Sequence, residues 1–351
     1  MATSNRIKYI DIARGIAIIC IVLGHLGIDS INKIVFTFHV PIFFFITGYF
    51  INNKLSIDDF ISNKVKTLIV PYVCTCTVII LLGTLKSGVF QGAEVAKETA
   101  GKWIYASFYG AGDTYFRPFY IKAIGAIWFL LATFWGSIFL RSTLNMKKRN
   151  RIAVILVLFV IGYWSRELCW FPFSIQAGCC ATLFMYIGYL FQDIKKAVQE
   201  LSTETKIGIS ILALTVWLSF IKNFQSFWLV HCDIGRGVID IVGCICGCYI
   251  IMLISSFIEK HTRHISNVLA FVGKYSLFVL CIHIVELNLI PWGTITRNLI
   301  AQGMPVDFGI YFIILAKFTI IMSLTVIFAK WNFTRRLFGF SKIEKTKLLN
   351  K

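Results

Sequence analysis

Three ionisable residues interrupt an otherwise apolar stretch near the start of the chain, DIARGIAIICIVLGH, residues 11–25. Asp11 and Arg14 open the stretch and His25 closes it. An ionisable side chain inside a membrane-spanning segment costs roughly 2.5–3.5 kcal/mol on insertion scales, so such residues indicate a functional site. Histidine suits acid–base chemistry, because its unperturbed pKa of about 6.5 lets it accept a proton at neutral pH.

Helix geometry predicts that these residues share one face. Eleven residues lead from Arg14 to His25, which is about three full helical turns and about 16 Å along the axis. Asp11 lies three residues before Arg14 and joins the same stripe. A snorkelling arginine and a packed histidine would explain each residue alone, but they do not explain the alignment. The face therefore offers a cation near the inner surface and a base deeper in the membrane.

Two further histidines are expected at a similar depth. His283 lies late in the chain in KYSLFVLCIHIVE, and Glu286 follows it by three residues, a spacing that allows a hydrogen bond on a helix. His39 lies in FTFHVPIFFFITGY. Three histidines near one level predict a polar cavity in the outer half of the membrane. Alternatively, any one of these histidines could serve only as a packed side chain in the protein interior.

The composition predicts the kind of scaffold that carries these residues. Of 351 residues, 57% are hydrophobic and 15% charged, and the mean hydropathy is +0.75. Such a chain is an all-α, polytopic membrane protein rather than a soluble domain. Residues 1–340 are expected to form one membrane domain and residues 341–351 a basic cytoplasmic tail. Ten segments are apolar enough to span: 9–27, 33–51, 68–86, 123–141, 151–168, 175–191, 207–224, 237–257, 268–290 and 308–330.

The positive charges predict the orientation. With a cytoplasmic N-terminus, 22 Lys and Arg residues fall on the cytoplasmic side and 10 on the other. Both termini are therefore expected in the cytoplasm, in the cytoplasmic membrane. The net charge of +18 then reflects topology and not nucleic-acid binding. The eleven cysteines fall mostly within spans, where they behave as small apolar residues, and no metal site is predicted.

The longest stretch between predicted spans, residues 87–122, is expected outside the cell. It contains WIYASFYGAGDTYFRPFY, whose aromatic, Gly, Asp and Arg residues are typical of a sugar-binding surface. Anchoring of aromatic side chains at the membrane interface explains much of the same composition, so both interpretations remain open.

Four motifs in order resemble the acyltransferase 3 family of membrane-bound acyltransferases that modify cell-surface glycans. They are Asp-x-x-Arg-x10-His at residues 11–25, FTFHVPIFFFITGYF in the second predicted span, AIWFLLATF with Trp128, and VGKYSLFVLCIH, which contains Ser276 and ends at His283. The sugar O-acetylase branch is the most similar. The resemblance covers nearly the whole chain.

The resemblance implies transfer of an acyl group, expected to be acetyl, from cytosolic acyl-CoA to a hydroxyl of a surface polysaccharide or lipid-linked glycan. His25 would be the general base or would itself carry the acyl group, Arg14 would engage acyl-CoA, and His283 would assist. Acyl-CoA would also meet Lys64 and Lys66 in NKVKTLIVPY. There the family often has arginine, and lysine cannot form the same forked contact with phosphate. The implied supporting residues are Asp11, His39, Trp128, Ser276 and Glu286.

Other hypotheses fit some of the same residues. A proton-coupled transporter or flippase of a small molecule or lipid-linked sugar would also carry intramembrane Asp, Arg, His and Glu, but no half-matching repeats are evident. A ligand-binding sensory membrane domain would be expected to carry an output domain. Asp29 makes HLGID resemble the His-x3-Asp pattern of soluble acyltransferases, although any loop Asp after a span would produce it. No feature of the sequence indicates an oligomeric state.

Overall fold

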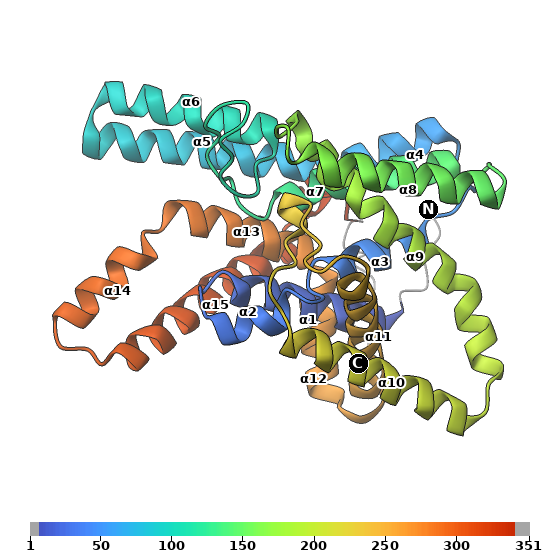
Figure 1. Cartoon of the computed structure of the whole chain (residues 1–351). Helices are drawn as coiled ribbons and strands as arrows, with labels where there is room; N and C mark the ends of the chain where they lie inside the picture. Colours follow the sequence, from blue (N-terminus) through green and yellow to red (C-terminus); the bar gives the residue numbers. More distant parts are fainter. Residues whose placement is uncertain (1–6, 341–351) are drawn as a thin grey trace.

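The computed structural model describes residues 7–340, so the predicted basic tail, 341–351, lies outside the described residues. Residues 7–340 are helical in nearly every segment (Figure 1). The β pairing within them is a single isolated bridge between Tyr115 and Ile121. The predicted all-α fold is therefore confirmed.

The helices follow one another with short connections. They are α1 (Lys8–Gly24), α2 (Asp29–Val35), α3 (Pro41–Phe50), α4 (Ile57–Lys64), the π-helical turn η1 (Val65–Ile69), α5 (Val70–Gln91), α6 (Ala93–Tyr109), α7 (Trp128–Thr143), α8 (Lys148–Ser165), the 3-10 turn η2 (Pro172–Ser174), α9 (Ile175–Glu200), α10 (Thr203–Lys222), the 3-10 turn η3 (Leu229–His231), α11 (Val238–His261), α12 (Arg263–Lys274), α13 (Ser276–Leu289), α14 (Trp292–Ala301), α15 (Val306–Lys330) and α16 (Asn332–Leu337).

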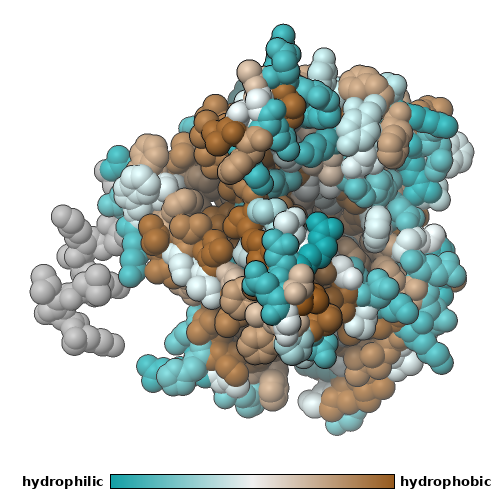
Figure 2. Space-filling view, turned by 90° about the vertical axis from the view of Figure 1, so that its left-hand side faces the viewer, coloured by the Kyte–Doolittle hydropathy of each residue, from teal (hydrophilic) through white to brown (hydrophobic). Residues whose placement is uncertain are grey.

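Several of these helices can cross a membrane. Among the described residues, five helical stretches are long and apolar enough, and a bent pair of helices, α12 with α13, makes a sixth if it counts as one span. Large apolar side chains remain exposed along them, including Leu81 at 63%, Leu212 at 66% and Leu315 at 68%. In Figure 2 hydrophobic side chains cover much of the visible face. The chain is a membrane protein, and the count of ten spans and the side of each terminus stay predictions.

The predicted span 33–51 is divided in the structure. Residues 36–40 form turns between α2 and α3, and α3 begins at Pro41. Proline lacks the N–H that would continue the preceding helix, so a new helix starts there. The side chains of Thr37 and His39 donate hydrogen bonds to the carbonyls of Ile34 and Val35 at the end of α2, and backbone amides of residues 37–39 donate to the same carbonyls.

The predicted span 268–290 is also divided. Helices α12 and α13 meet at Tyr275 with a bend of 68°. The Tyr275 hydroxyl accepts a hydrogen bond from the buried Arg335 of α16 at 2.7 Å, which holds the outer side of the bend. The bend places α13, with His283, at an angle to α12.

The stretch expected as an outer loop contains a helix that turns back. Helix α6 packs along α5 (Figure 1). The ring of Trp103 lies against Gly83, and the Tyr72 hydroxyl donates a hydrogen bond to the Ser107 carbonyl. The chain after α6 is tied to the next segment by a hydrogen bond from the Ile124 amide to the Ala111 carbonyl. Residues 110–127 are thereby held at the start of α7, and Gly112, Asp113 and Ala126 among them line the cavity described below.

Helix α1 occupies the interior and packs against α12, α11 and α13. Its closest approach is to α12, where Gly15 of α1 meets the Leu269 backbone and Gly273 of α12 meets the Asp11 carbonyl. A side chain at either glycine would overlap the backbone of the other helix. This contact fixes the helix that carries Asp11, Arg14 and His25.

We expect Gly273→Ala to destabilise the protein, because the added methyl group must separate α1 from α12, and overpacking of this kind costs about 1–3 kcal/mol. Gly208→Ala in α10 is the matched control, since its methyl group would meet no atom within 4 Å and alanine favours a helix. Thermal unfolding in detergent should give a lower midpoint for Gly273→Ala only. Equal midpoints for the two variants would contradict the tight contact.

Candidate active site

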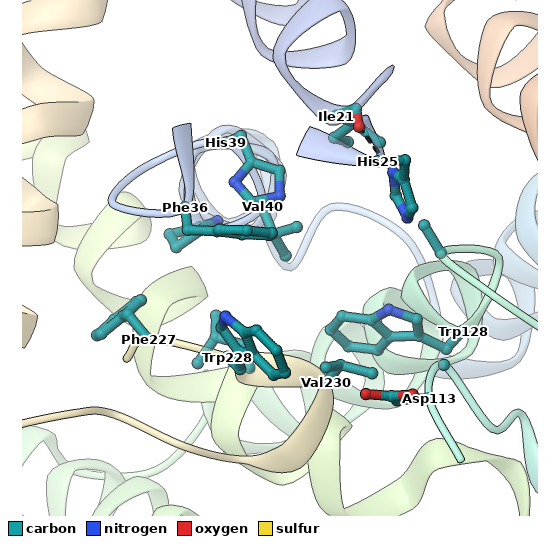
Figure 3. Close-up of a pocket in the computed structure, with 14 residues that line it drawn as sticks. Ile21, His25, Phe36, His39, Val40, Asp113, Trp128, Phe227, Trp228 and Val230 are labelled. Carbon is teal, nitrogen blue, oxygen red and sulfur yellow. Dashed lines mark hydrogen bonds between the residues drawn. The ribbon is translucent and has the colours of Figure 1, made fainter. Parts of the chain in front are cut away.

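A cavity of about 270 Å³ lies beyond the end of α1. Its walls come from the end of α1, residues 36–41, residues 112–113, the start of α7 and residues 227–230. His25, His39 and Trp128 border it, and Figure 3 shows their rings around one space, with Trp228 and Asp113 across from the histidines. The cavity thus joins two predicted histidines and the predicted tryptophan.

His25 follows the last residue of α1, where the helix leaves carbonyl groups without partners. Its Nδ1 lies 2.8 Å from the Ile21 carbonyl oxygen, shown as a dashed line in Figure 3. A carbonyl oxygen can only accept, so Nδ1 carries the proton and Nε2 keeps a free electron pair. The imidazole is held in the tautomer that a general base requires.

His283 lies next to His25 on the side away from the cavity. Its Nε2 lies 3.4 Å from Nδ1 of His25, and the two rings meet edge to face at 5.0 Å between centroids. On the other side its Nδ1 donates to Oε1 of Glu286 at 2.8 Å, which is the hydrogen bond that the three-residue spacing predicted. The His25 Nδ1 proton is therefore shared between Ile21 and His283.

Glu286 ends the chain of contacts and is itself buried. It accepts hydrogen bonds from His283 of α13 and from the Trp292 indole of α14, and Nζ of Lys317 in α15 lies 3.5 Å from Oε1. Lys317 is also buried and lies over the Trp292 ring, 5.4 Å from its centroid. A buried carboxylate needs such donors and a counter-charge, since an unpaired one is strongly unfavourable.

His39 and Trp128 shape the opposite sides of the cavity. The Nδ1 atom of His39 donates to the Val35 carbonyl at 2.6 Å, and its ring packs edge to face against Phe36. Trp128 is the first residue of α7 and is 5% exposed, so it forms a fixed wall. Both residues border the same cavity as His25.

The basic residues predicted to meet an anionic donor lie near the beginning of α1 and where α4 passes into η1. Arg14 is 3.7 Å from the Asp11 carboxylate and lies over the Phe50 ring. Lys64 ends α4 close enough to Arg14 for the two charges to repel, whereas Lys66 is exposed within η1. Like charges gathered at one place favour the binding of an anion such as phosphate. Arg14 and Lys64 thus lie within electrostatic range of each other, and Lys66 follows Lys64 by two residues.

Two residues named from the sequence lie away from the cavity walls. Ser276 begins α13 at the bend, about two helical turns before His283. Asp29 begins α2 with an exposed side chain. Neither residue lines the cavity. The structure assigns them no contact with His25.

Sequence reasoning missed other residues at this site. Lys317 is an ionisable residue within a predicted span, a signal that marks it for a functional pairing. Asp113 and Trp228 come from loops, and no local spacing relates them to His25. Asp113 accepts a hydrogen bond from His231 Nε2 at 3.0 Å, and this bond is the main reason that the pKa of the Asp113 carboxyl is lowered. The cavity therefore has a carboxylate in its wall.

Comparison with known proteins gives two matches. A family model described as an acyltransferase domain (Acyl_transf_3) matches residues 7–329. The chain is also similar to nodulation protein NolL of Mesorhizobium japonicum, with 25% identity over 170 residues, which cover 44% of this chain. The similarity spans 40% of that protein. No solved structure matches significantly.

We expect Lys317→Met to destabilise the protein by about 3–5 kcal/mol, because it leaves the Glu286 carboxylate buried without its cation. The double variant Lys317→Met/Glu286→Gln should recover most of the loss, since neither charge remains. Thermal unfolding in detergent measures both effects, and Lys330→Met at the exposed end of α15 is the control. A double variant no more stable than Lys317→Met would show that the pairing is not what stabilises this region.

Proposed function

The chain belongs to the acyltransferase domain family, whose model covers residues 7–329, and we propose that it moves an acetyl group from cytosolic acetyl-CoA to a hydroxyl of a cell-surface glycan. The observation that carries this proposal is the hydrogen-bonded series that leads from His25, at the wall of the cavity, to the buried His283 and Glu286. The family match supports a membrane-bound O-acyltransferase. It does not support the transporter hypothesis.

In the proposed reaction, Nε2 of His25 takes the proton of the acceptor hydroxyl as its oxygen attacks the thioester carbonyl carbon. The ester bond forms as the carbon–sulfur bond breaks, and the CoA thiolate then receives the proton from the imidazolium. General acid–base catalysis of this kind typically contributes about 10²–10⁴-fold.

His283 and Glu286 would stabilise His25 when it is protonated. The imidazolium formed on His25 keeps its Nδ1 proton directed toward Ile21 and His283. The Glu286 carboxylate beyond His283 supplies negative charge to the series. The same logic orients a catalytic histidine in other acyl-transfer enzymes. An alternative in which His25 itself carries the acetyl group uses the same free Nε2 atom.

The donor would be held at the inner end of α1. Arg14 and Lys64 gather positive charge there, which fits the phosphate groups of CoA. Arg14 lies on the same helix as His25, about 16 Å away along the axis. An extended pantetheine arm would lead from these cations toward His25, and the acceptor would enter from the opposite, outer side.

We expect His25→Ala to reduce acetyl transfer by at least about 10²-fold, because the base is lost, while acetyl-CoA binding persists. The assay combines purified protein, labelled acetyl-CoA and a surface-glycan extract. His261→Ala is a matched control, because His261 Nδ1 also donates to the carbonyl four residues earlier, at the end of α11. Equal acetylation by wild type and His25→Ala would contradict the assignment. Intact mass measured without acceptor detects any acetylated His25.

We expect Arg14→Ala to weaken acetyl-CoA binding, and Arg14→Lys to restore little of it, since a lysine lacks the forked geometry. Equilibrium binding of acetyl-CoA to the purified variants measures the loss directly. Arg263→Ala, at the exposed start of α12, is the control. Wild-type affinity in Arg14→Ala would remove Arg14 from the donor site.

A further inference from the structure

A second hollow lies next to the His25 cavity, beyond the wall that residues 112–113 and 228–230 form. It has a volume of about 380 Å³ and is lined by Tyr115, Arg166, Glu167, Trp170, His231 and Asp233. Unlike the apolar groove between α5, α13 and α15, it is lined mainly by side chains that can form hydrogen bonds. None of these residues has a role in the proposed reaction.

The two hollows share their walls. Residues 112–113 and 228–230 border the His25 cavity, and the next residues of the same two segments, Tyr115 and His231, border the second hollow. The Asp113–His231 hydrogen bond and a 2.5 Å bond from the Tyr115 hydroxyl to the Val230 carbonyl join the segments. The two hollows are therefore adjacent, on either side of these two joined segments.

The polar groups of the second hollow are held in place. The Arg166 guanidinium donates to the Cys232 carbonyl and to Glu167, both at 3.0 Å, and lies 3.6 Å from Asp233. It also stacks on Tyr163, 4.1 Å from the ring centroid. Glu167 keeps 74% of its side chain exposed, so its carboxylate retains the capacity to accept further hydrogen bonds. Pre-organised groups of this kind bind at low entropic cost.

Aromatic side chains lie beside the polar groups of the second hollow. Tyr115 packs parallel to Trp170 at 4.1 Å between ring centroids, which fixes its ring at the wall. Trp228 is 43% exposed and stacks on His231 where the two hollows meet. The exposed Trp228 ring and the partly buried Tyr115 ring, beside fixed hydrogen-bonding groups, suit a ligand with both apolar faces and hydroxyl groups, as a sugar ring has.

The charges also limit the ligand. Asp113, Glu167 and Asp233 nearly balance Arg166 and Arg117, whose guanidinium donates to the Glu167 carbonyl. The carboxylates would repel a strongly anionic ligand, and the two arginines would repel a strongly cationic one. A neutral, polyhydroxylated ring can donate to the carboxylates and accept from Arg166.

From this placement we infer that the second hollow is a subsite for the sugar next to the one that is acetylated. The acceptor is therefore an oligosaccharide or polymer of at least two sugars rather than a monosaccharide. This inference rests on the proposed function and deepens it. Binding energy from a neighbouring sugar would orient the reacting hydroxyl, so that a truncated acceptor loses turnover as well as affinity.

The test compares acceptors of different length. Purified full-length protein receives acetyl-CoA with monosaccharide or disaccharide pools, separated by size after partial hydrolysis of the producing strain's surface polysaccharide. We expect wild type to show at least about tenfold higher kcat/KM for disaccharides, the effect of one hydrogen bond to a charged group. Glu167→Gln and Asp233→Asn should each bring the disaccharide-to-monosaccharide ratio close to one. Glu94→Gln, on the exposed surface of α6, should keep the wild-type ratio.

Saturation-transfer NMR with the disaccharide pool measures binding without turnover, and the same variants should weaken it. Equal kcat/KM for both pools in wild type, or disaccharide binding that Glu167→Gln leaves intact, would overturn the subsite. Disaccharide binding that the variants weaken, without acetylation of either pool, would retain the subsite and reject the proposed function.

Discussion

Glu286 carries a carboxylate into the interior of a membrane protein, where it must be surrounded by donors and a counter-charge. Those groups come from His283 on its own helix, Trp292 on α14 and Lys317 on α15. The hydrogen bonds and the counter-charge of Glu286 thus join α13, α14 and α15. Through His283, Glu286 also determines the orientation of His25 on a fourth helix, α1.

The parts of this arrangement that depend on one helix could be predicted from the sequence. The stripe of Asp11, Arg14 and His25 and the His283–Glu286 hydrogen bond follow from helical periodicity, and both are local. Lys317 could be singled out as an intramembrane charge, but not assigned to Glu286, because 31 residues separate them and only tertiary packing joins them. The same limit applies to Asp113 and His231, which are 118 residues apart.

Departures from the predicted elements have similar causes. Hydropathy averages over a window, so it joined α2 to α3 across Pro41 and α12 to α13 across Tyr275. The proline was a visible signal, whereas the bend at Tyr275 depends on Arg335 from a distant helix. Composition left residues 87–122 open to sugar binding or to anchoring of aromatic side chains at the membrane interface, and it could not show that α6 folds back along α5. That turn is what brings Asp113 to the His25 cavity.

The glycine contact between α1 and α12 holds α1 in a fixed position. At Gly15 and Gly273 the two backbones lie so close that a side chain at either position would overlap the other helix. Along α1 itself, Arg14 and His25 are separated by about 16 Å, the rise of eleven helical residues. In the proposed reaction, one donor meets both Arg14 and His25, and such a donor carries its anionic group and its acyl group far apart on one extended molecule. An acyl phosphate, whose phosphate is bonded directly to the acyl group, would reach one end of α1 and never both.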